Sequence, residues 1–208
     1  MVIVHGAGSC KESHHDFARA AVALGLAAIC FDQRGHGQSS GRLGAGAVHD
    51  VVTVAGRLRD ALGDHDAPLA LRGSSMGGYL AILAAQPARA QAVVAICPAS
   101  AGGLRRGLLD GRFDFAADSQ AFVGFLDAHD LAAGVRSLTV PLLLMHAEGD
   151  EQVPVEHSRE LAAEVRNPHS RLVAVPGGHH RSIQHDEELQ AVSLRFVQRS
   201  LALASETR

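Results

Sequence analysis

The chain has 208 residues, of which 47% are hydrophobic and 20% are charged. These fractions are typical of a globular protein and exclude an intrinsically disordered chain. The formal net charge of -3 leaves no basic field to attract phosphates, so we expect no nucleic-acid partner.

The three cysteines, Cys10, Cys30 and Cys97, are widely spaced and form no C-x-x-C pair. An odd count without such a pair favours a reducing compartment over a disulfide framework. The N-terminal residues carry no basic lead, and no stretch approaches the ~20 unbroken apolar residues of a membrane span. We therefore predict a cytoplasmic protein that does not cross a membrane.

Short apolar runs alternate with longer amphipathic stretches, without internal repeats or long linkers. The expected strands span residues 2–5, 27–31, 68–72, 92–97, 140–146 and 171–175. The expected helices span residues 17–24, 47–62, 76–86, 155–165 and 183–201. This alternation predicts an α/β fold, a mostly parallel sheet of about six strands with helices on both faces, in one domain over residues 1–208. Ligands bind such sheets at the carboxyl ends of the strands.

Two segments match the G-x-S-x-G pattern, which places a serine on a sharp strand-to-helix turn. The first contains Ser39, lies in a Gly-rich loop and follows no apolar strand directly. The second contains Ser75, follows the strand at 68–72 and runs into a helix. Ser75 is therefore the predicted nucleophile, with an ordinary helix cap as the alternative role.

A serine hydroxyl needs a base to accept its proton, and a carboxylate to orient that base. The ends of the fifth and sixth expected strands supply Asp150 and His180, in the chain order expected on this type of sheet. His179 is the alternative base and Glu148 the alternative acid.

Five segments together resemble the alpha/beta-hydrolase superfamily, in particular small serine hydrolases of the dienelactone-hydrolase and esterase kind. They are HGAG at 5–8, DQRGHGQS at 32–39, GSSMG at 73–77, GDEQVP at 149–154 and PGGHH at 176–180. The resemblance implies Ser75 as nucleophile, Asp150 as acid and His180 as base. It also implies an oxyanion hole formed by the backbone N–H groups of Met76 and Ala7, with Gly8 as the alternative to Ala7.

Two features depart from this pattern. The superfamily begins with a hairpin that is missing before the strand at 2–5, so either the sheet is a minimal one of about six strands or the start of the sequence lies too late. Ala147 stands where a glycine is usual. Without the hairpin, the strand at 27–31 is expected to form an exposed edge, which suggests either a homodimer or a covered edge as a hypothesis.

Other polar residues are expected to be structural. Asp32, Arg34 and His36 are predicted to hold the loop after the second strand together. The 13 histidines do not form a recognisable ligand set, and we expect no metal and no cofactor.

Residues 99–139 form an insertion at the position where this superfamily carries a lid. Phe113, Phe115 and Phe122 are candidate substrate-binding residues, or else they pack the lid together with Phe125. The short insertion predicts small to medium substrates, and the favoured reaction is hydrolysis of a carboxylic ester. Thioester and small-peptide or amide hydrolysis use the same groups, and a non-catalytic ligand-binding protein is the alternative of another class.

Overall fold

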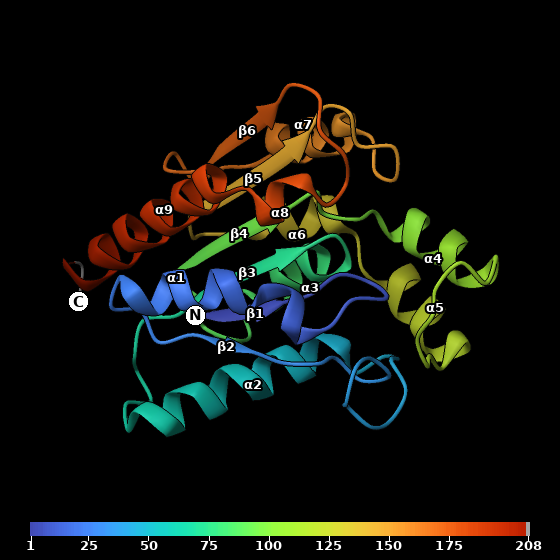
Figure 1. The fold of residues 1–208 in the computed structure, drawn as a ribbon, viewed down its shortest axis with the longest axis horizontal. Helices are drawn as coiled ribbons and strands as arrows, with labels where there is room; N and C mark the ends of the chain where they lie inside the picture. The colour runs from blue at the N-terminus through green and yellow to red at the C-terminus, as the bar shows by residue number, and fades with distance from the viewer. Residues whose placement is uncertain (207–208) are drawn as a thin grey trace.

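The computed structural model describes residues 1–206, which are built around one sheet with helices on both sides (Figure 1). The strand order is β2-β1-β3-β4-β5-β6, and all five strand pairings in the described residues are parallel. The strands are β1 Val2–Val4, β2 Ile29–Cys30, β3 Ala70–Ser74, β4 Ala92–Ile96, β5 Leu142–Ala147 and β6 Arg171–Val175. The predicted fold class is confirmed.

The sheet has one apolar core on each face, as expected for parallel strands covered by helices. On one face, α1 (His15–Ala23) and α9 (Glu187–Glu206) pack on sheet residues such as Val94 and Met145. On the other face, α2 (Ala47–Leu62) and α3 (Met76–Ala84) pack on residues such as Val93. The central strands β3, β4 and β5 are buried along their whole length.

The remaining helices connect these layers. A 3-10 helix, Lys11–His14, precedes α1; α7 (Val155–Glu164) lies between β5 and β6, and α8 (Ser182–His185) precedes α9. The insertion, residues 99–139, contains α4 (Ala101–Leu109), α5 (Ser119–Ala128) and α6 (Leu131–Ser137). An isolated β-bridge between Leu43 and Ala117 joins it to the loop after β2.

Most elements begin or end one or two residues away from the predicted positions, and three of these differences have a clear local basis. The expected helix 183–201 is broken in two, because Asp186 is extended and its Oδ1 accepts the N–H of Leu189 at 2.9 Å, which starts α9 afresh. The expected strand 27–31 contributes only two residues to the sheet, because β2 pairs with β1 alone. The expected strand 68–72 is shifted towards Ser74, which still pairs with Ile96 of β4.

None of the helices in residues 1–206 is long and apolar enough to cross a membrane.

Candidate active site

Ser75 lies on the turn between β3 and α3, in a backbone conformation that side chains rarely adopt. Its φ is 53° and its ψ is -120°. Its N–H donates to Ile96 O at 2.8 Å, and its own carbonyl accepts from Tyr79 and Ala99 at 3.1 Å each. Holding a residue there costs about 1–3 kcal/mol, which the surrounding packing must offset, and such strain is typical of functional turns.

The glycines on either side of Ser75 are needed because backbone approaches them closely. A Cβ on Gly73 would lie 2.0 Å from Gly77 O, and a Cβ on Gly77 would lie 2.1 Å from Val4 O. Real Cβ atoms essentially never come so close to another atom. The turn is therefore locked between its own helix and β1, and it holds Ser75 at the carboxyl end of the sheet. Ser39, in contrast, is followed by turns and bends and not directly by a helix.

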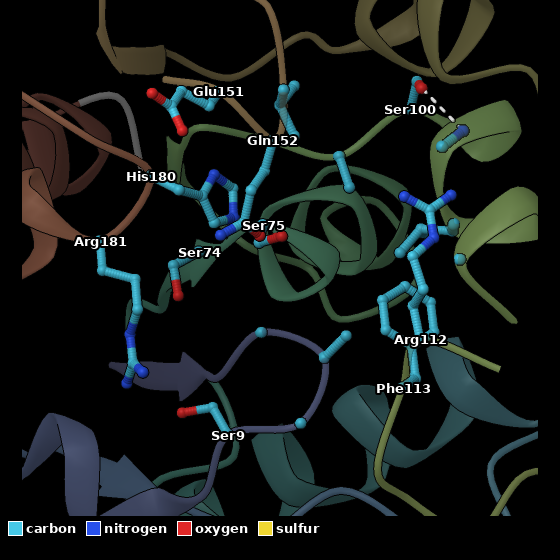
Figure 2. Close-up of a pocket in the computed structure, with 18 of the residues that line it drawn as sticks. Ser9, Ser74, Ser75, Ser100, Arg112, Phe113, Glu151, Gln152, His180 and Arg181 are labelled. Atoms are coloured by element: carbon cyan, nitrogen blue, oxygen red, sulfur yellow. Dashed lines mark hydrogen bonds between the residues drawn. The ribbon is translucent and has the colours of Figure 1, made fainter. Parts of the chain in front are cut away.

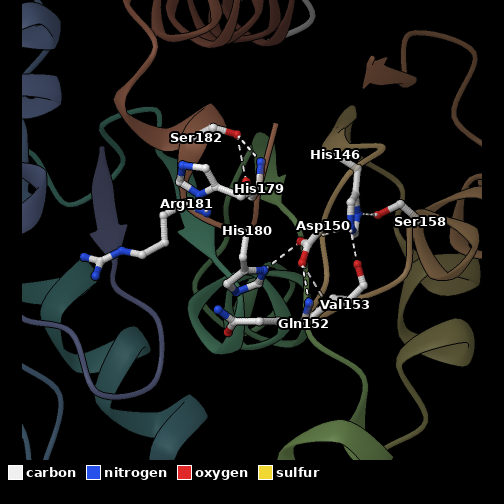
Figure 3. Close-up of polar contacts among 9 residues, drawn as sticks. All are labelled: His146, Asp150, Gln152, Val153, Ser158, His179, His180, Arg181 and Ser182. Atoms are coloured by element: carbon white, nitrogen blue, oxygen red, sulfur yellow. Dashed lines mark hydrogen bonds and ion pairs between the residues drawn. The ribbon is translucent and has the colours of Figure 1, made fainter. Parts of the chain in front are cut away.

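Asp150 and His180 form a close pair (Figure 3). His180 Nδ1 lies 2.7 Å from Asp150 Oδ2, and Asp150 Oδ1 accepts the N–H groups of Gln152 and Val153 at 2.8 and 2.9 Å. The side chain of Asp150 is fully buried, whereas that of His180 is 11% exposed. Because the carboxylate can only accept, Nδ1 of His180 carries the proton and Nε2 is free to act as a base.

A second histidine, His146, lies on the other side of the same carboxylate (Figure 3). Its Nε2 lies 2.8 Å from Val153 O and 3.3 Å from Asp150 Oδ2, and its Nδ1 lies 2.7 Å from Ser158 Oγ. The carbonyl fixes the proton on Nε2, so this N–H also points towards Asp150, and Nδ1 accepts from the Ser158 hydroxyl. The sequence prediction missed His146, although its spacing of four residues before Asp150 at a strand end was a usable signal.

These hydrogen bonds control the charge of Asp150. Burial raises the pKa of Asp150, but the hydrogen bonds from His146, His180 and the Val153 N–H outweigh it and hold the pKa well below its usual range. Asp150 is therefore a carboxylate at neutral pH, as a partner for a protonated imidazole requires.

Ser75 and His180 line the same cavity, of about 770 Å³ (Figure 2). Ala7 also lines it, and Met76 is the first residue of α3, where an N–H has no acceptor within the helix. Within residues 1–206 there is no hydrogen bond between the Ser75 hydroxyl and His180. Such contacts often tighten only when substrate binds.

Cys97 is the remaining side chain that could join a ligand set here. Its sulfur, an Asp150 oxygen and a His180 nitrogen lie within 4.8 Å of one another. Burial raises the pKa of the Cys97 thiol to about 12, and both Asp150 oxygens already accept hydrogen bonds. A metal needs a thiolate and a free carboxylate oxygen, so this group fits a metal poorly.

The alternative residues are placed elsewhere. Glu148 pairs with Arg159 at 2.7 Å, and exposed His179 accepts the N–H of Arg181 through its Nδ1 at 3.3 Å. Neither one is hydrogen-bonded to the Asp150–His180 pair.

The three candidate substrate-binding phenylalanines lie in different surroundings. Phe113 lines the cavity, whereas Phe115 stacks on His36 with ring centroids 4.1 Å apart. Phe122 is completely buried and stacks on Phe125 at 5.9 Å, so it packs the insertion and does not line the cavity.

The loop after β2 is held by the residues expected to hold it. Asp32 accepts hydrogen bonds from the backbone of Lys11 and of Gln38, and Arg34 forms two hydrogen bonds with Asp50 at 2.6 and 2.7 Å.

The parallel sheet, the strained serine turn and the buried acid–histidine pair define the chain as an alpha/beta hydrolase. The family model described as Hydrolase_4, serine aminopeptidase S33, matches residues 1–108, which is just over half of the chain. The chain belongs to this family.

The sequence identity to individual relatives is low. The chain is 28% identical to the uncharacterized protein YfhR of Escherichia coli O157:H7 over 72% of its length, and spans about half (51%) of that protein. It is 26% identical to a monoacylglycerol lipase of Mycolicibacterium smegmatis, covering 90% of this chain and 83% of the lipase. Among solved structures, the monoacylglycerol lipase of Paleococcus ferrophilus matches with a TM-score of 0.72 at 21% identity, covering 97% of this chain and 93% of that one.

Proposed function

We propose that this protein is a serine hydrolase that cleaves carboxylic esters with small to medium acyl groups. The observation that supports this most directly is the strained Ser75 turn, which opens on the same cavity as a histidine held by a buried carboxylate. The lipase from Mycolicibacterium smegmatis, which matches over most of both chains, also favours an ester substrate.

The first half of the reaction forms an acyl-enzyme. Ser75 Oγ attacks the carbonyl carbon while His180 Nε2 takes its proton, and Asp150 stabilises the resulting imidazolium. The N–H groups of Ala7 and Met76 donate to the oxyanion of the tetrahedral intermediate. When this intermediate collapses, Nε2 gives its proton to the leaving alkoxide.

The second half releases the acid. Water enters at the position that the alcohol has left, and His180 Nε2 takes one of its protons as it attacks the acyl carbon. A second tetrahedral intermediate collapses, and the proton on Nε2 returns to Ser75 Oγ. In this proposal the insertion acts as a short lid over the cavity.

Amide hydrolysis is the second candidate, because the family model is described as a serine aminopeptidase. Thioesters would react at the same groups. A panel of matched ester, thioester and aminoacyl anilide substrates separates these activities.

The first test is intact-mass spectrometry after treatment with a fluorophosphonate probe. We expect one adduct on the wild-type protein, none on Ser75→Ala, and a normal adduct on Ser39→Ala, which alters the other G-x-S-x-G segment. An unlabelled, folded wild-type protein would contradict the proposal and favour a non-catalytic ligand-binding role.

A further inference from the structure

The charge of the cavity differs in sign from that of the whole chain. The chain carries a formal net charge of -3. The charged residues that line the cavity are three arginines and one glutamate: Arg106, Arg112, Arg181 and Glu151. The cavity is therefore a positive region on an otherwise acidic protein. Such a region favours a ligand that carries negative charge.

Two of these arginines have charges that no acidic side chain neutralises. Arg112 pairs with Asp110 at 2.8 Å. Arg106 and Arg181 form no ion pair with any residue of the described chain. A guanidinium cannot lose its proton near neutral pH, so both remain cationic and free to pair with a ligand.

The arginines lie on different walls of the cavity. Arg106 belongs to α4 in the insertion, and Arg181 directly follows His180 in the loop after β6. Figure 2 shows Arg112 and Arg181 on opposite sides of Ser75. Apolar side chains, Leu104 and Phe113, also line the cavity and can cover a hydrocarbon chain between a reacting carbonyl and a charged end.

Building on the proposed ester hydrolysis, we propose that the substrate is an ester that itself carries a carboxylate. Arg106 or Arg181 binds this carboxylate, because a guanidinium offers paired N–H donors that match its two oxygens. The same charge repels a substrate with a free amino group, since Glu151 is the single acidic residue that lines the described cavity.

The test compares three ethyl esters of nearly equal length. Monoethyl adipate is anionic, the ethyl ester of adipic acid monoamide is neutral, and the ethyl ester of ε-aminocaproic acid is cationic. Each hydrolysis consumes one water and releases ethanol, a carboxylate and a proton, so a pH-stat follows all three in the same way. We expect kcat/KM to be about 5-fold higher for the anionic ester than for the neutral one, the upper range for an exposed ion pair. The cationic ester should react most slowly, and high salt should reduce both differences.

The variants are Arg106→Gln and Arg181→Gln, with Arg105→Gln as the matched control. Arg105 is the neighbour of Arg106 on the same helix, is exposed, and does not line the cavity. At least one of the two cavity variants should lose the preference for the anionic ester while keeping its rate on the neutral one. The variant that does so identifies the wall on which the carboxylate lies.

Two outcomes overturn the proposal while leaving the hydrolase intact. One is equal rates on all three esters, and the other is a preference that survives both substitutions. If none of the esters is hydrolysed, calorimetric binding of adipate monoamide replaces the rates. Binding that weakens in Arg106→Gln or Arg181→Gln but not in Arg105→Gln supports anion recognition even where Ser75 fails to react with the fluorophosphonate, and binding unaffected by all three contradicts it.

Discussion

Asp150 is held from two sides by histidines, and only one of them faces the cavity. His180 is placed to exchange protons, whereas His146 is completely buried and donates from Nε2 towards Val153 O and Asp150. We infer that His146 is a positioning residue that keeps the carboxylate ionised and correctly directed.

Replacing His146 should therefore slow the reaction of Ser75. In His146→Leu we expect the second-order rate constant for fluorophosphonate labelling to fall about 10-fold or more, because a small displacement of a reacting group has large effects on rate. His146→Gln, which keeps one N–H donor, should recover part of the rate at equal stability. An unchanged labelling rate in folded His146→Leu would show that Asp150 holds its position without it.

The sequence predicted that Ser75, Asp150 and His180 would lie at one edge of the sheet, because each follows a strand, and the structure pairs Asp150 with His180 and places Ser75 and His180 on one cavity. The sequence pattern does not predict the direction in which a side chain points within a packed segment. Phe113 and Phe122 are nine residues apart and chemically identical, yet one lines the cavity and the other is buried against Phe125. Only the packing of α4 and α5 decides between them.

At the scale of elements, the serine turn depends on the close approach of α3 to β1. Gly77→Ala would place a Cβ 2.1 Å from Val4 O and 2.6 Å from His5 O. Both contacts are with backbone, so α3 must move away from the strand. We expect the free energy of unfolding to fall by about 2–3 kcal/mol, as for other overpacked cores, with loss of Ser75 labelling.

Gly124→Ala is the matched control for this prediction. Gly124 lies in α5, is exposed, and a Cβ there would meet no atom within 4 Å. Alanine is the better helix former, so this variant should gain up to about 1 kcal/mol. Urea unfolding measures the free energy of unfolding of both variants. A similar change in this free energy for Gly77→Ala and Gly124→Ala would contradict the argument from close backbone approach.

Most element boundaries followed from hydrophobic period, and α2 spans the predicted residues 47–62. The boundaries that moved depend on single contacts. Asp186 caps α9 and separates it from α8. The edge strand β2 is shorter than predicted, because it pairs with β1 alone. A periodic pattern does not encode such contacts.

At the scale of the whole molecule, the fold buries several histidines, among them His5 and His14. His5, at the end of β1, is 1% exposed, and its neutral form is fixed by two bonds. Nδ1 donates to Gly6 O at 2.8 Å, and Nε2 accepts the N–H of Gln33 at 3.0 Å. His14 is 2% exposed and accepts from Arg72 at 3.3 Å.

Burial lowers the pKa of His5 to about 4 and that of His14 to about 3, in the second case with help from the nearby Arg72 charge. In the unfolded chain both titrate near 6.5. Above that pH both states are neutral, and stability does not depend on these groups. As the pH falls from 6.5 towards 4, these two histidines bind protons in the unfolded chain but stay neutral in the folded chain, so the free energy of unfolding decreases.

We expect the free energy of unfolding to fall by up to about 1.4 kcal/mol per pH unit for each of these histidines in that window. The pKa values of His36, His157 and His185 are also lowered, so they act in the same direction. The pKa of Asp32 is lowered from 3.8 to about 2, so the stability that its carboxylate contributes is lost only below pH 3.8. Asp32 therefore does not affect the slope in this pH window.

Urea unfolding between neutral pH and about pH 4.5 measures this slope. His5→Gln should flatten this slope, because it removes one of the titrating groups. A stability that stays level as the wild type is acidified would mean that the buried histidines accept protons without disturbing the fold, and would contradict the neutral state assigned to His5 by its two hydrogen bonds.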